Sequence, residues 1–267
     1  MGIQTGESGG PMKLADELKG RDSAIAHCPA RATCPLSAVC GVETSAGQPA
    51  LFPTVSEVEQ GQLVWTDVRH EQRALIVRSG VFSCLSNPDQ REELPFSLFS
   101  RGDSFGFAEL YLPNKMADMY YARALTAGQV CSFASKPLRR HLEDLPTPQR
   151  ERILSCLLVN TTSAMFAQVE MLSKTRIADR IAILLARLDR LVERGGCSAD
   201  ELRLTHADIA KLIAADRVSV TRALRKMEQD DQVLVGYRSI APKDAPAADD
   251  PKFDYCRNFF KPEDAGR

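Results

Sequence analysis

The sequence has no run of about 18 consecutive apolar residues, the length that a membrane-spanning helix requires. Its first residues, MGIQTGESGGPMK, also lack the apolar core of a secretory signal. Both absences favour a cytoplasmic protein without a membrane partner. In that reducing compartment, the eight cysteines of the 267-residue chain are expected to be thiols, metal ligands or redox sensors rather than structural disulfides.

An excess of charge of either sign is lacking as well. Lys and Arg number 34 and Asp and Glu number 35, so no global field attracts nucleic acid, and DNA binding would have to come from a local basic patch. The sequence shows no nucleophile–base pairing, and the glycines of SRGDSFGF are typical of β-turns rather than of a phosphate-binding loop. We therefore do not expect an enzyme.

Changes of pattern divide the chain into five segments, and 44% of its residues are hydrophobic, enough for a core and about two domains. Residues 1–50 form a loop-rich arm that contains cysteines. Residues 51–145 carry short apolar runs between Gly and Pro residues, which predict a compact all-β sandwich or roll. Residues 146–173 and 174–241 are predicted to be mainly helical, and residues 242–267 form a tail.

The segment 146–173 predicts one long helix, because apolar residues recur at steps of three and four. This stripe consists of Leu154, Leu158, Thr161, Met165, Val169 and Leu172. An apolar stripe needs a partner to bury it. It either packs on the β-unit or pairs with the same helix of a second copy as a two-fold coiled coil, which is the arrangement that we favour.

Residues 174–241 predict short helices followed by a β-hairpin. The helical run from Ile177 ends in a Gly pair, a common helix stop. Thr205 and Asp208 have the spacing of a capping box, which predicts one helix over 207–213 and, after a short link, a second helix from Arg217. Two short helices around a tight turn form a helix-turn-helix, and QVLVGYRSI would add a small wing.

The second of these helices carries the basic patch that the near-neutral total conceals. Between Lys211 and Glu228 there are five basic residues against two acidic ones. Arginine presents a fork that suits guanine, and Ser or Thr beside it can reach phosphates or bases in the major groove. The alternative is a solvated amphipathic helix in a protein-interaction or ligand-binding module. The predicted DNA-contacting residues are Arg217, Val218, Ser219, Thr221, Arg222, Arg225 and Lys226.

The succession of a β-unit, a long helix and the run LTHADIAKLIAADRVSVTRALRKME resembles the Crp/Fnr superfamily of bacterial transcription regulators over nearly the whole chain. The resemblance implies an α+β fold with an N-terminal cyclic-nucleotide-binding-like β-roll, a long dimerisation helix and a C-terminal winged helix-turn-helix. It also implies a homodimer that binds a palindromic site in double-stranded promoter DNA and contacts RNA polymerase.

Members of this superfamily typically read bases with an Arg-Glu-x-x-x-Arg arrangement, and this chain has Arg217, Val218 and Arg222 at those positions. Glutamate accepts a hydrogen bond from cytosine, whereas valine offers only apolar contact, for example to a thymine methyl group. The missing acid predicts a half-site that is richer in A·T pairs than the usual one.

The resemblance does not extend to the binding of cyclic AMP. Members that bind this nucleotide hold its phosphate with an Arg that follows a Gly-Glu-Leu motif. Glu109 and Leu110 are present here, but Met119 or a neighbour takes the place of the Arg, and Arg123 comes several residues late. Because a buried anion without its cation is costly, cyclic AMP is not expected to be the effector.

The cysteines indicate a different effector. HCPARATCPLSAVC places three of them at C-x5-C-x5-C spacing, and QVCSFASKPL holds another late in the β-unit. Both features resemble the oxygen-sensing fumarate and nitrate reduction branch of the superfamily, although the first spacing in that branch is C-x2-C. The resemblance implies that Cys28, Cys34, Cys40 and Cys131 ligate a [4Fe-4S] cluster. A thiol–disulfide switch, a structural zinc on the same cysteines and a small ligand in the β-roll stay open as alternatives.

A cluster held in this way would join the arm to the β-roll beside the dimer helix. Its assembly would shift that helix toward the dimer, and its oxidative loss would release the helix again. The sequence therefore predicts a regulator whose dimerisation and DNA affinity respond to oxygen or to redox state.

Overall fold

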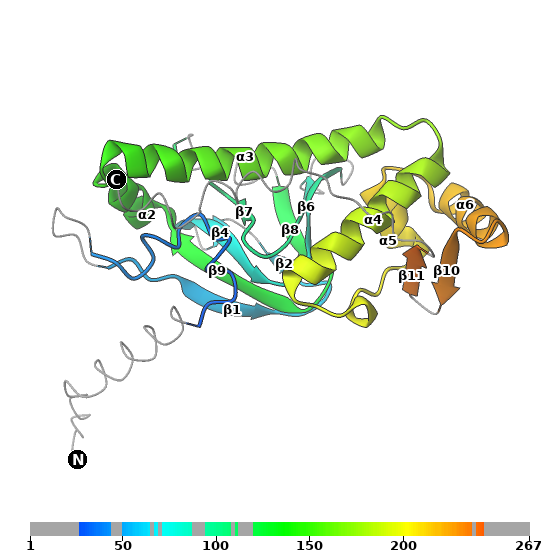
Figure 1. Cartoon of the computed structure of the whole chain (residues 1–267), viewed down its shortest axis with the longest axis horizontal. Coiled ribbons are helices and arrows are strands. Elements are labelled where there is room, and N and C mark those ends of the chain that lie inside the picture. The colour runs from blue at the N-terminus through cyan, green and yellow to red at the C-terminus, as the bar shows by residue number, and fades with distance from the viewer. Residues whose placement is uncertain are drawn as a thin grey trace, which may run out of the picture.

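The computed structural model describes residues 27–43, 50–64, 67–68, 71–86, 94–107, 110–111, 120–236 and 239–242. Within them, a β-unit lies beside one long helix, and a second group of helices with a small hairpin follows (Figure 1). The predicted α+β class is confirmed, with its β-rich first part and its helical C-terminal part. The first 26 residues of the arm, Glu109, Met119 and the tail after Pro242 lie outside the described residues.

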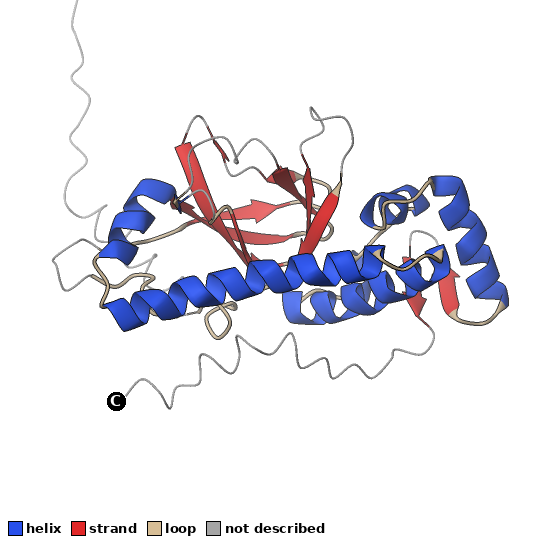
Figure 2. Ribbon diagram, turned by 90° about the horizontal axis from the view of Figure 1, so that it is seen from above, coloured by secondary structure: helices blue, strands red, loops and turns tan. Residues whose placement is uncertain are grey.

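Two antiparallel sheets make up the β-unit (Figure 2). The first contains, in spatial order, β1 (Thr54–Val58), β9 (Gly128–Ala134), β4 (Glu71–Ser79) and β3 (Asp67–Val68), and β7 (Ser104–Phe105) also pairs with β4. The second contains, in order, β2 (Leu63–Val64), β8 (Tyr120–Ala124), β5 (Phe82–Ser86) and β6 (Pro95–Phe99). The short apolar runs of the sequence are thus strands of two packed sheets.

Strand β4 contributes to a different core on each of its faces, because successive side chains of a strand point to opposite sides. Val77 packs with Phe82 and Phe99 in the core between the sheets. Ile76 is buried on the other face, in a core that also contains Leu36 of the arm. The described part of the arm therefore belongs to the folded β-unit.

Two helices follow β9: α2 (Ser135–Glu143), which the sequence pattern did not predict, and α3 (Thr147–Leu172). Helix α3 runs along the β-unit and reaches the C-terminal helices (Figures 1 and 2). It buries Ile153 and Leu157 in the core that contains the arm, and Met171 in the core of the C-terminal helices. One helix thus contacts both parts of the molecule.

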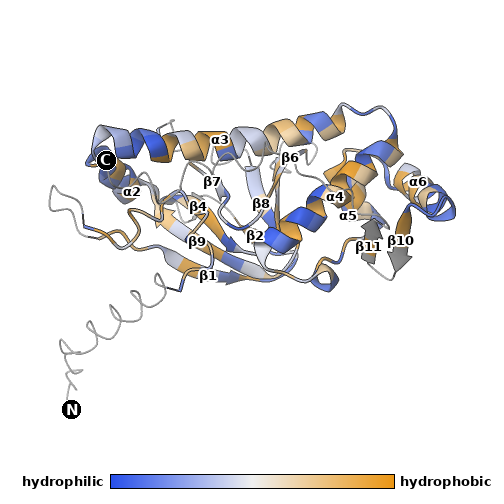
Figure 3. Ribbon diagram, viewed as in Figure 1, coloured by the Kyte–Doolittle hydropathy of each residue, from blue (hydrophilic) through white to orange (hydrophobic). Residues whose placement is uncertain are grey.

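Only the ends of the predicted apolar stripe pack inward: Leu154 against the core that contains the arm and Leu172 against the core of the C-terminal helices. Most of the stripe between them does not pack on the β-unit. Leu158 is 65% exposed and Val169 is 62% exposed, and Phe166 beside them is 73% exposed. Apolar residues accordingly recur along much of the helix in Figure 3. By length and composition α3 is the one described helix that could cross a membrane, but its Ile153 and Leu157 are packed in the core of the β-unit.

The C-terminal elements share one core, in which Ile181 and Leu184 pack with Ile209, Val220 and Leu224. Its first helix ends at the predicted Gly pair, where Gly196 has a left-handed φ of 71° that favours glycine. The predicted helix-turn-helix and wing are both present, the first helix beginning one residue before the predicted start. The elements are α4 (Ile177–Gly195), the 3-10 helix η3 (Ala199–Glu201), α5 (His206–Leu212), α6 (Arg217–Gln229), β10 (Val233–Gly236) and β11 (Ser239–Pro242).

Candidate nucleic-acid interface and cysteine cluster

Side-chain caps fix the starts of both helices of the helix-turn-helix. The Thr205 hydroxyl accepts a hydrogen bond from the Asp208 backbone N–H at 3.2 Å, and the Asp208 carboxylate accepts one from the Thr205 N–H at 2.8 Å. This is the predicted capping box. Asp216, which was not predicted as a cap, accepts from the Ser219 N–H at 2.8 Å, and its hydrogen bonds with Ser219 lower the pKa of the Asp216 carboxyl.

A tight turn between α5 and α6 sets the angle of the second helix. The Ala215 N–H donates to the Ala210 carbonyl at 2.9 Å, and Ala214 between them has a φ of 49°, in the left-handed region that L-residues disfavour. The buried side chains of Val220 and Leu224 then anchor α6 on the C-terminal core. The orientation of α6 is therefore set at its cap and along its buried face.

The opposite face of α6 is open and basic. Val220, Leu224 and Met227 are the buried residues of α6, and Val218 is 67% exposed. The other exposed members of the predicted DNA-contacting set are Arg217, Arg222, Arg225 and Lys226. An exposed helix face that combines arginine forks with an apolar side chain has the donors and the methyl groups for base contacts in a major groove.

Two predicted DNA-contacting residues are less exposed than the rest. Ser219 and Thr221 are half-buried. The Thr221 hydroxyl donates to the Arg217 carbonyl at 2.9 Å and lies 3.0 Å from His206 Nδ1 on α5. Thr221 therefore joins the two helices, a role that the sequence did not predict.

A buried polar chain connects the long helix to this domain. Arg187 of α4 donates to the Gln168 side-chain oxygen on α3 at 3.1 Å, and the Gln168 amide donates to the Leu212 carbonyl of α5 at 2.9 Å. Burial lowers the pKa of Arg187 to about 10. Because buried polar groups need hydrogen-bond partners, these two hydrogen bonds fix the positions of α3, α4 and α5 relative to one another.

The described part of the arm folds as successive turns on the β-unit. The Cys34 N–H donates to the Ala30 carbonyl at 2.7 Å, and the Cys40 N–H donates to the Leu36 carbonyl at 2.9 Å. Cys40 also pairs with Leu51 in an isolated parallel bridge. The arm cysteines are thus held by backbone hydrogen bonds against the sheet.

All four predicted cluster cysteines lie at this junction. Cys131 is on β9, opposite Ile76 of β4, and it shares a hydrophobic core with Cys34 and Cys40. Burial and, to a smaller extent, the nearby Cys28 thiol raise the pKa of Cys131 to about 12 and that of Cys40 to about 11. Burial also raises the pKa of Cys34 strongly, against the effect of its hydrogen bond with Leu36. The four thiols are free and within electrostatic reach of one another.

Two arginines oppose these upward shifts. The positive charge of Arg78 lowers the pKa of both Cys40 and Cys131, and its side chain hydrogen-bonds Cys131, while Arg31 lowers the pKa of Cys40. Arg78 lies in a β-bulge, where the β4–β9 register shifts between Val77 and Ser79. Bulges redirect side chains beside functional sites. No local sequence pattern predicts this bulge.

The four cysteines supply thiol sulfur, the donor type of both iron–sulfur clusters and structural zinc sites. Within the described residues, no three Cys, His, Asp or Glu side chains converge as the ligands of one metal ion do. A tetrahedral zinc would need four sulfurs at about 2.3 Å from one point. A [4Fe-4S] cluster takes one thiolate on each iron and so keeps its sulfurs further apart. Four clustered thiols beside two guanidinium groups have the donor type and the compensating charge for such a group.

The expectation about cyclic AMP stays a prediction. Leu110 is buried, and Arg123 lies on β8, where it pairs with Leu63 and Ser83. The other two residues of that argument, Glu109 and Met119, lie outside the described residues.

Comparison with known proteins identifies the C-terminal region. Residues 179–247 match the model of the Crp-like helix-turn-helix domain, so this part of the chain is a domain of that type. Over 199 residues the chain is 25% identical to the global nitrogen regulator of Nostoc sp., an alignment that covers 72% of this chain and 86% of that protein.

Solved structures share the fold of most of the chain. A transcriptional regulator of the CRP family from Thermus thermophilus matches with a TM-score of 0.54 at 17% identity, over 71% of this chain and 92% of that one. The c-di-GMP-responsive global regulator of Xanthomonas campestris matches with a TM-score of 0.56 at 18% identity, over 71% of this chain and 93% of its own. The likeness covers the fold and does not single out the oxygen-sensing branch.

Proposed function

We propose that this chain is a transcription regulator of the Crp/Fnr superfamily that binds DNA as a homodimer in the cytoplasm and has no enzymatic activity. The observation that carries the proposal is the open basic face of α6, held by capped helices in a domain that matches the Crp-like helix-turn-helix. The relatives named above are regulators, which supports the same assignment. The DNA-bound dimer would contact RNA polymerase.

The dimer would form through the exposed stripe of α3. Leu158, Met165 and Val169 are accessible, while other residues of α3 hold it on the β-unit. Parallel packing of two such stripes around a two-fold axis would present two α6 helices to DNA. Two-fold related recognition helices read half-sites about one helical turn, roughly 34 Å, apart.

The exposed residues of α6 would contact different parts of the DNA. Arg217 and Arg222 would read guanine edges, and Val218 would contact thymine methyl groups, which favours an A·T-richer half-site. Arg225 and Lys226, further along the helix, would contact phosphates and so contribute affinity without sequence preference. Ser219 would reach a phosphate from the first turn, and Thr221 would keep α6 in place on α5.

The effector of this regulator would be a [4Fe-4S] cluster held by Cys28, Cys34, Cys40 and Cys131. When bound, such a group supplies redox and oxygen sensitivity. The arm contributes three thiols on backbone turns, and β9 contributes the fourth from the centre of a sheet. Arg78 and Arg31 would offset the negative charge of the thiolates, and the packing of Leu36 and Val39 would keep water away from one side of the site.

DNA binding is tested by selecting bound sequences from a random double-stranded library and measuring affinity against salt. We expect a two-fold symmetric site and a slope of log affinity against log salt of about −0.9 for each phosphate contact. Arg217→Ala and Arg222→Ala should each cost about 1–3 kcal/mol of binding free energy. Arg139→Ala on the exposed surface of α2 is the matched control. Failure to select any sequence, or equal affinity in all variants, would refute DNA recognition.

Cluster binding is tested on protein purified without oxygen, by visible absorption and by iron and acid-labile sulfide assays. We expect about four irons per chain, with a broad absorption that bleaches in air. Cys131→Ser should lose both signals, whereas Cys84→Ser, a buried cysteine in the core between the sheets, should keep them. A colourless, iron-free protein after reconstitution would refute the cluster and favour a disulfide switch, zinc or a small molecule.

A further inference from the structure

One loop of the β-unit lies between the cysteine arm and the DNA-binding domain. It is the turn 100–103, which connects β6 to β7. The turn is closed by hydrogen bonds from the Asp103 N–H to the Ser100 carbonyl at 2.9 Å and from the Ser100 N–H to the Asp103 carboxylate at 2.8 Å. Val77 of β4 fixes it further, through the Gly102 N–H and the Asp103 carbonyl, both at 2.9 Å. Such a turn moves as one piece.

The arm contacts this turn at Gly102, through Thr33. A methyl group added at Gly102 would lie 2.7 Å from Thr33 Cβ and 2.9 Å from the Thr33 carbonyl oxygen, so Thr33 leaves no room for a side chain at Gly102. Gly102 also has a φ of 86°, which a side chain would strain. Thr33 is the residue before Cys34, so the peptide that carries this cysteine is joined directly to the contact.

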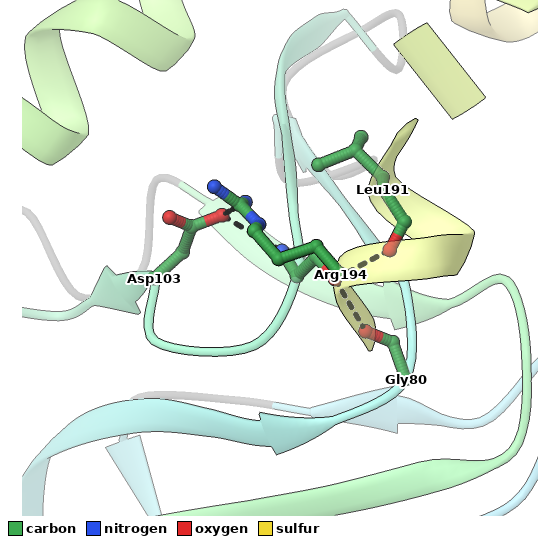
Figure 4. Close-up of polar contacts among 5 residues, drawn as sticks. Gly80, Asp103, Leu191 and Arg194 are labelled. Carbon is green, nitrogen blue, oxygen red and sulfur yellow. Dashed lines mark hydrogen bonds and ion pairs between the residues drawn. The ribbon is translucent and has the colours of Figure 1, made fainter. Parts of the chain in front are cut away.

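The same turn holds the end of α4, the first helix of the DNA-binding domain. The Ser100 hydroxyl lies 2.7 Å from the Leu191 carbonyl and 3.2 Å from the Gly80 carbonyl. The Asp103 carboxylate, which is buried, forms an ion pair with Arg194. In Figure 4, Arg194 points toward Asp103, and dashed lines end at the Leu191 and Gly80 carbonyls, the two acceptors of the Ser100 hydroxyl.

Close backbone packing completes this contact. The Gly80 N–H donates to the Gly195 carbonyl at 3.1 Å, and a methyl group at Gly195 would lie 2.8 Å from the Gly80 oxygen and 2.9 Å from Ser100 Oγ. The Arg101 guanidinium lies against Gly196. The end of α4 therefore has no room to shift while the turn stays in place.

We propose that the turn 100–103 is a relay within one chain, which carries rearrangements of the cysteine arm to the DNA-binding domain. Thr33 acts on Gly102, and Ser100 and Asp103 act on Leu191 and Arg194. This route adds to the dimer helix and does not need a second copy of the chain. Its regulatory meaning rests on the proposed function, but the mechanical coupling between arm and α4 does not.

The coupling is tested by hydrogen exchange on the full chain, without DNA or cluster. Gly102→Ala must disturb the contact between Thr33 and Gly102. We expect the backbone amides of residues 30–34 and of residues 191–197 to exchange about fivefold faster, which corresponds to the loss of about one hydrogen bond. Gly61→Ala is the matched control, because Gly61 has a similar φ of 84° but no atom within 4 Å of an added methyl. Thr33→Ala, with Ser37→Ala as its control, tests the same route from the arm alone.

Unchanged exchange at 191–197 in both Gly102→Ala and Thr33→Ala would overturn the relay.

The regulatory role of the relay is tested by the ratio of the DNA affinities of iron-loaded and iron-free protein. The double variant Asp103→Asn with Arg194→Met removes both charges of the ion pair together, so that neither is left without its partner. It should bring this ratio closer to one by about 2- to 30-fold. Asp189→Asn on the exposed side of α4 should not. A wild-type ratio of one would instead refute the proposed switch, and an unchanged ratio in the double variant would refute the relay as its route.

Discussion

Substitution of Leu158 by Glu should separate the dimer without unfolding the subunit. Leu158 belongs to the exposed stripe of α3 and is 65% exposed in the single chain, so a charge there meets water in the monomer. In the proposed dimer the same position faces the partner helix. The two glutamates of a symmetric pair would then lose water and lie close to each other. Desolvation and the repulsion of like charges would both destabilise the dimer.

The size of the effect follows from the area that remains to be buried. Complete burial of a leucine side chain is worth about 1.5–3 kcal/mol. About two-thirds of Leu158 is available, or roughly 1–2 kcal/mol for each subunit. The residue occurs twice in a two-fold dimer, so its loss should weaken association by roughly 2–4 kcal/mol, about 30- to 1,000-fold in the dissociation constant.

Sedimentation equilibrium over a dilution series measures this constant, and thermal unfolding checks that the subunit stays folded. Leu63→Glu, which adds the same charge to an exposed leucine of the edge strand β2, should change neither. Affinity for a full palindromic site should fall with the dimer population, whereas affinity for a single half-site should not. A dissociation constant within about threefold of wild type would contradict an α3 interface, because threefold is under 1 kcal/mol.

Four further changes have defined outcomes. Thr205→Ala removes the cap of α5 and should lower the free energy of unfolding by about 1 kcal/mol in urea titrations, while Thr205→Ser should restore most of it. Ala214→Gly relieves the left-handed φ in the turn and should raise the melting temperature rather than lower it. Burial lowers the pKa of His141 in the folded protein. The neutral imidazole therefore contributes its full stability above the unfolded pKa of about 6.5, and this contribution is lost as the pH falls through the lower pKa of the folded state. Between about pH 7 and pH 5, the free energy of unfolding of His141→Gln should fall less than that of wild type, by at most about 1.4 kcal/mol per pH unit. Val218→Glu restores the acid that accepts from cytosine, and repeated site selection should recover half-sites with a C·G pair in place of an A·T pair, a change worth about 1–3 kcal/mol.

The features of the fold that the sequence predicted correctly are those with local signals. Thr205 and Asp208 are three residues apart, so their capping box is visible in the sequence, and so is the Gly pair that ends α4. The short apolar run of β4, which a glycine follows, likewise predicts its strand. Asp216, in contrast, lacked the downstream Glu or Gln that marks a capping box, and its role became clear only from its hydrogen bond with Ser219.

The core face of α3 was missed for a physical reason. The predicted stripe followed one set of large apolar residues. The face that packs inward combines other large ones, Ile153, Leu157 and Met171, with smaller or polar residues: Cys156, Ala164 and Gln168. Small and polar residues fit where a helix lies close to a sheet or joins a buried hydrogen-bond chain, and a hydrophobic pattern gives them no weight. Large apolar residues that stay exposed in the folded chain, such as Phe166, then mark a second contact surface of α3, separate from its core face.

The choice of effector depends on few residues, because the same fold serves regulators that respond to different signals. The structural relative from Xanthomonas campestris is c-di-GMP-responsive, yet it matches this chain over most of its length. In this chain, the candidate effector site is the grouping of Cys131 with the arm thiols, together with Arg78 in the β4 bulge. Cysteine spacing in the sequence pointed to the thiols, but Arg78 is placed by the pairing of β4 with β9, which no local pattern encodes. Charges around such a site therefore have to be sought in the fold. If the proposed cluster forms, Arg78→Met should change the rate at which its visible absorption bleaches in air, while the four thiols stay in place.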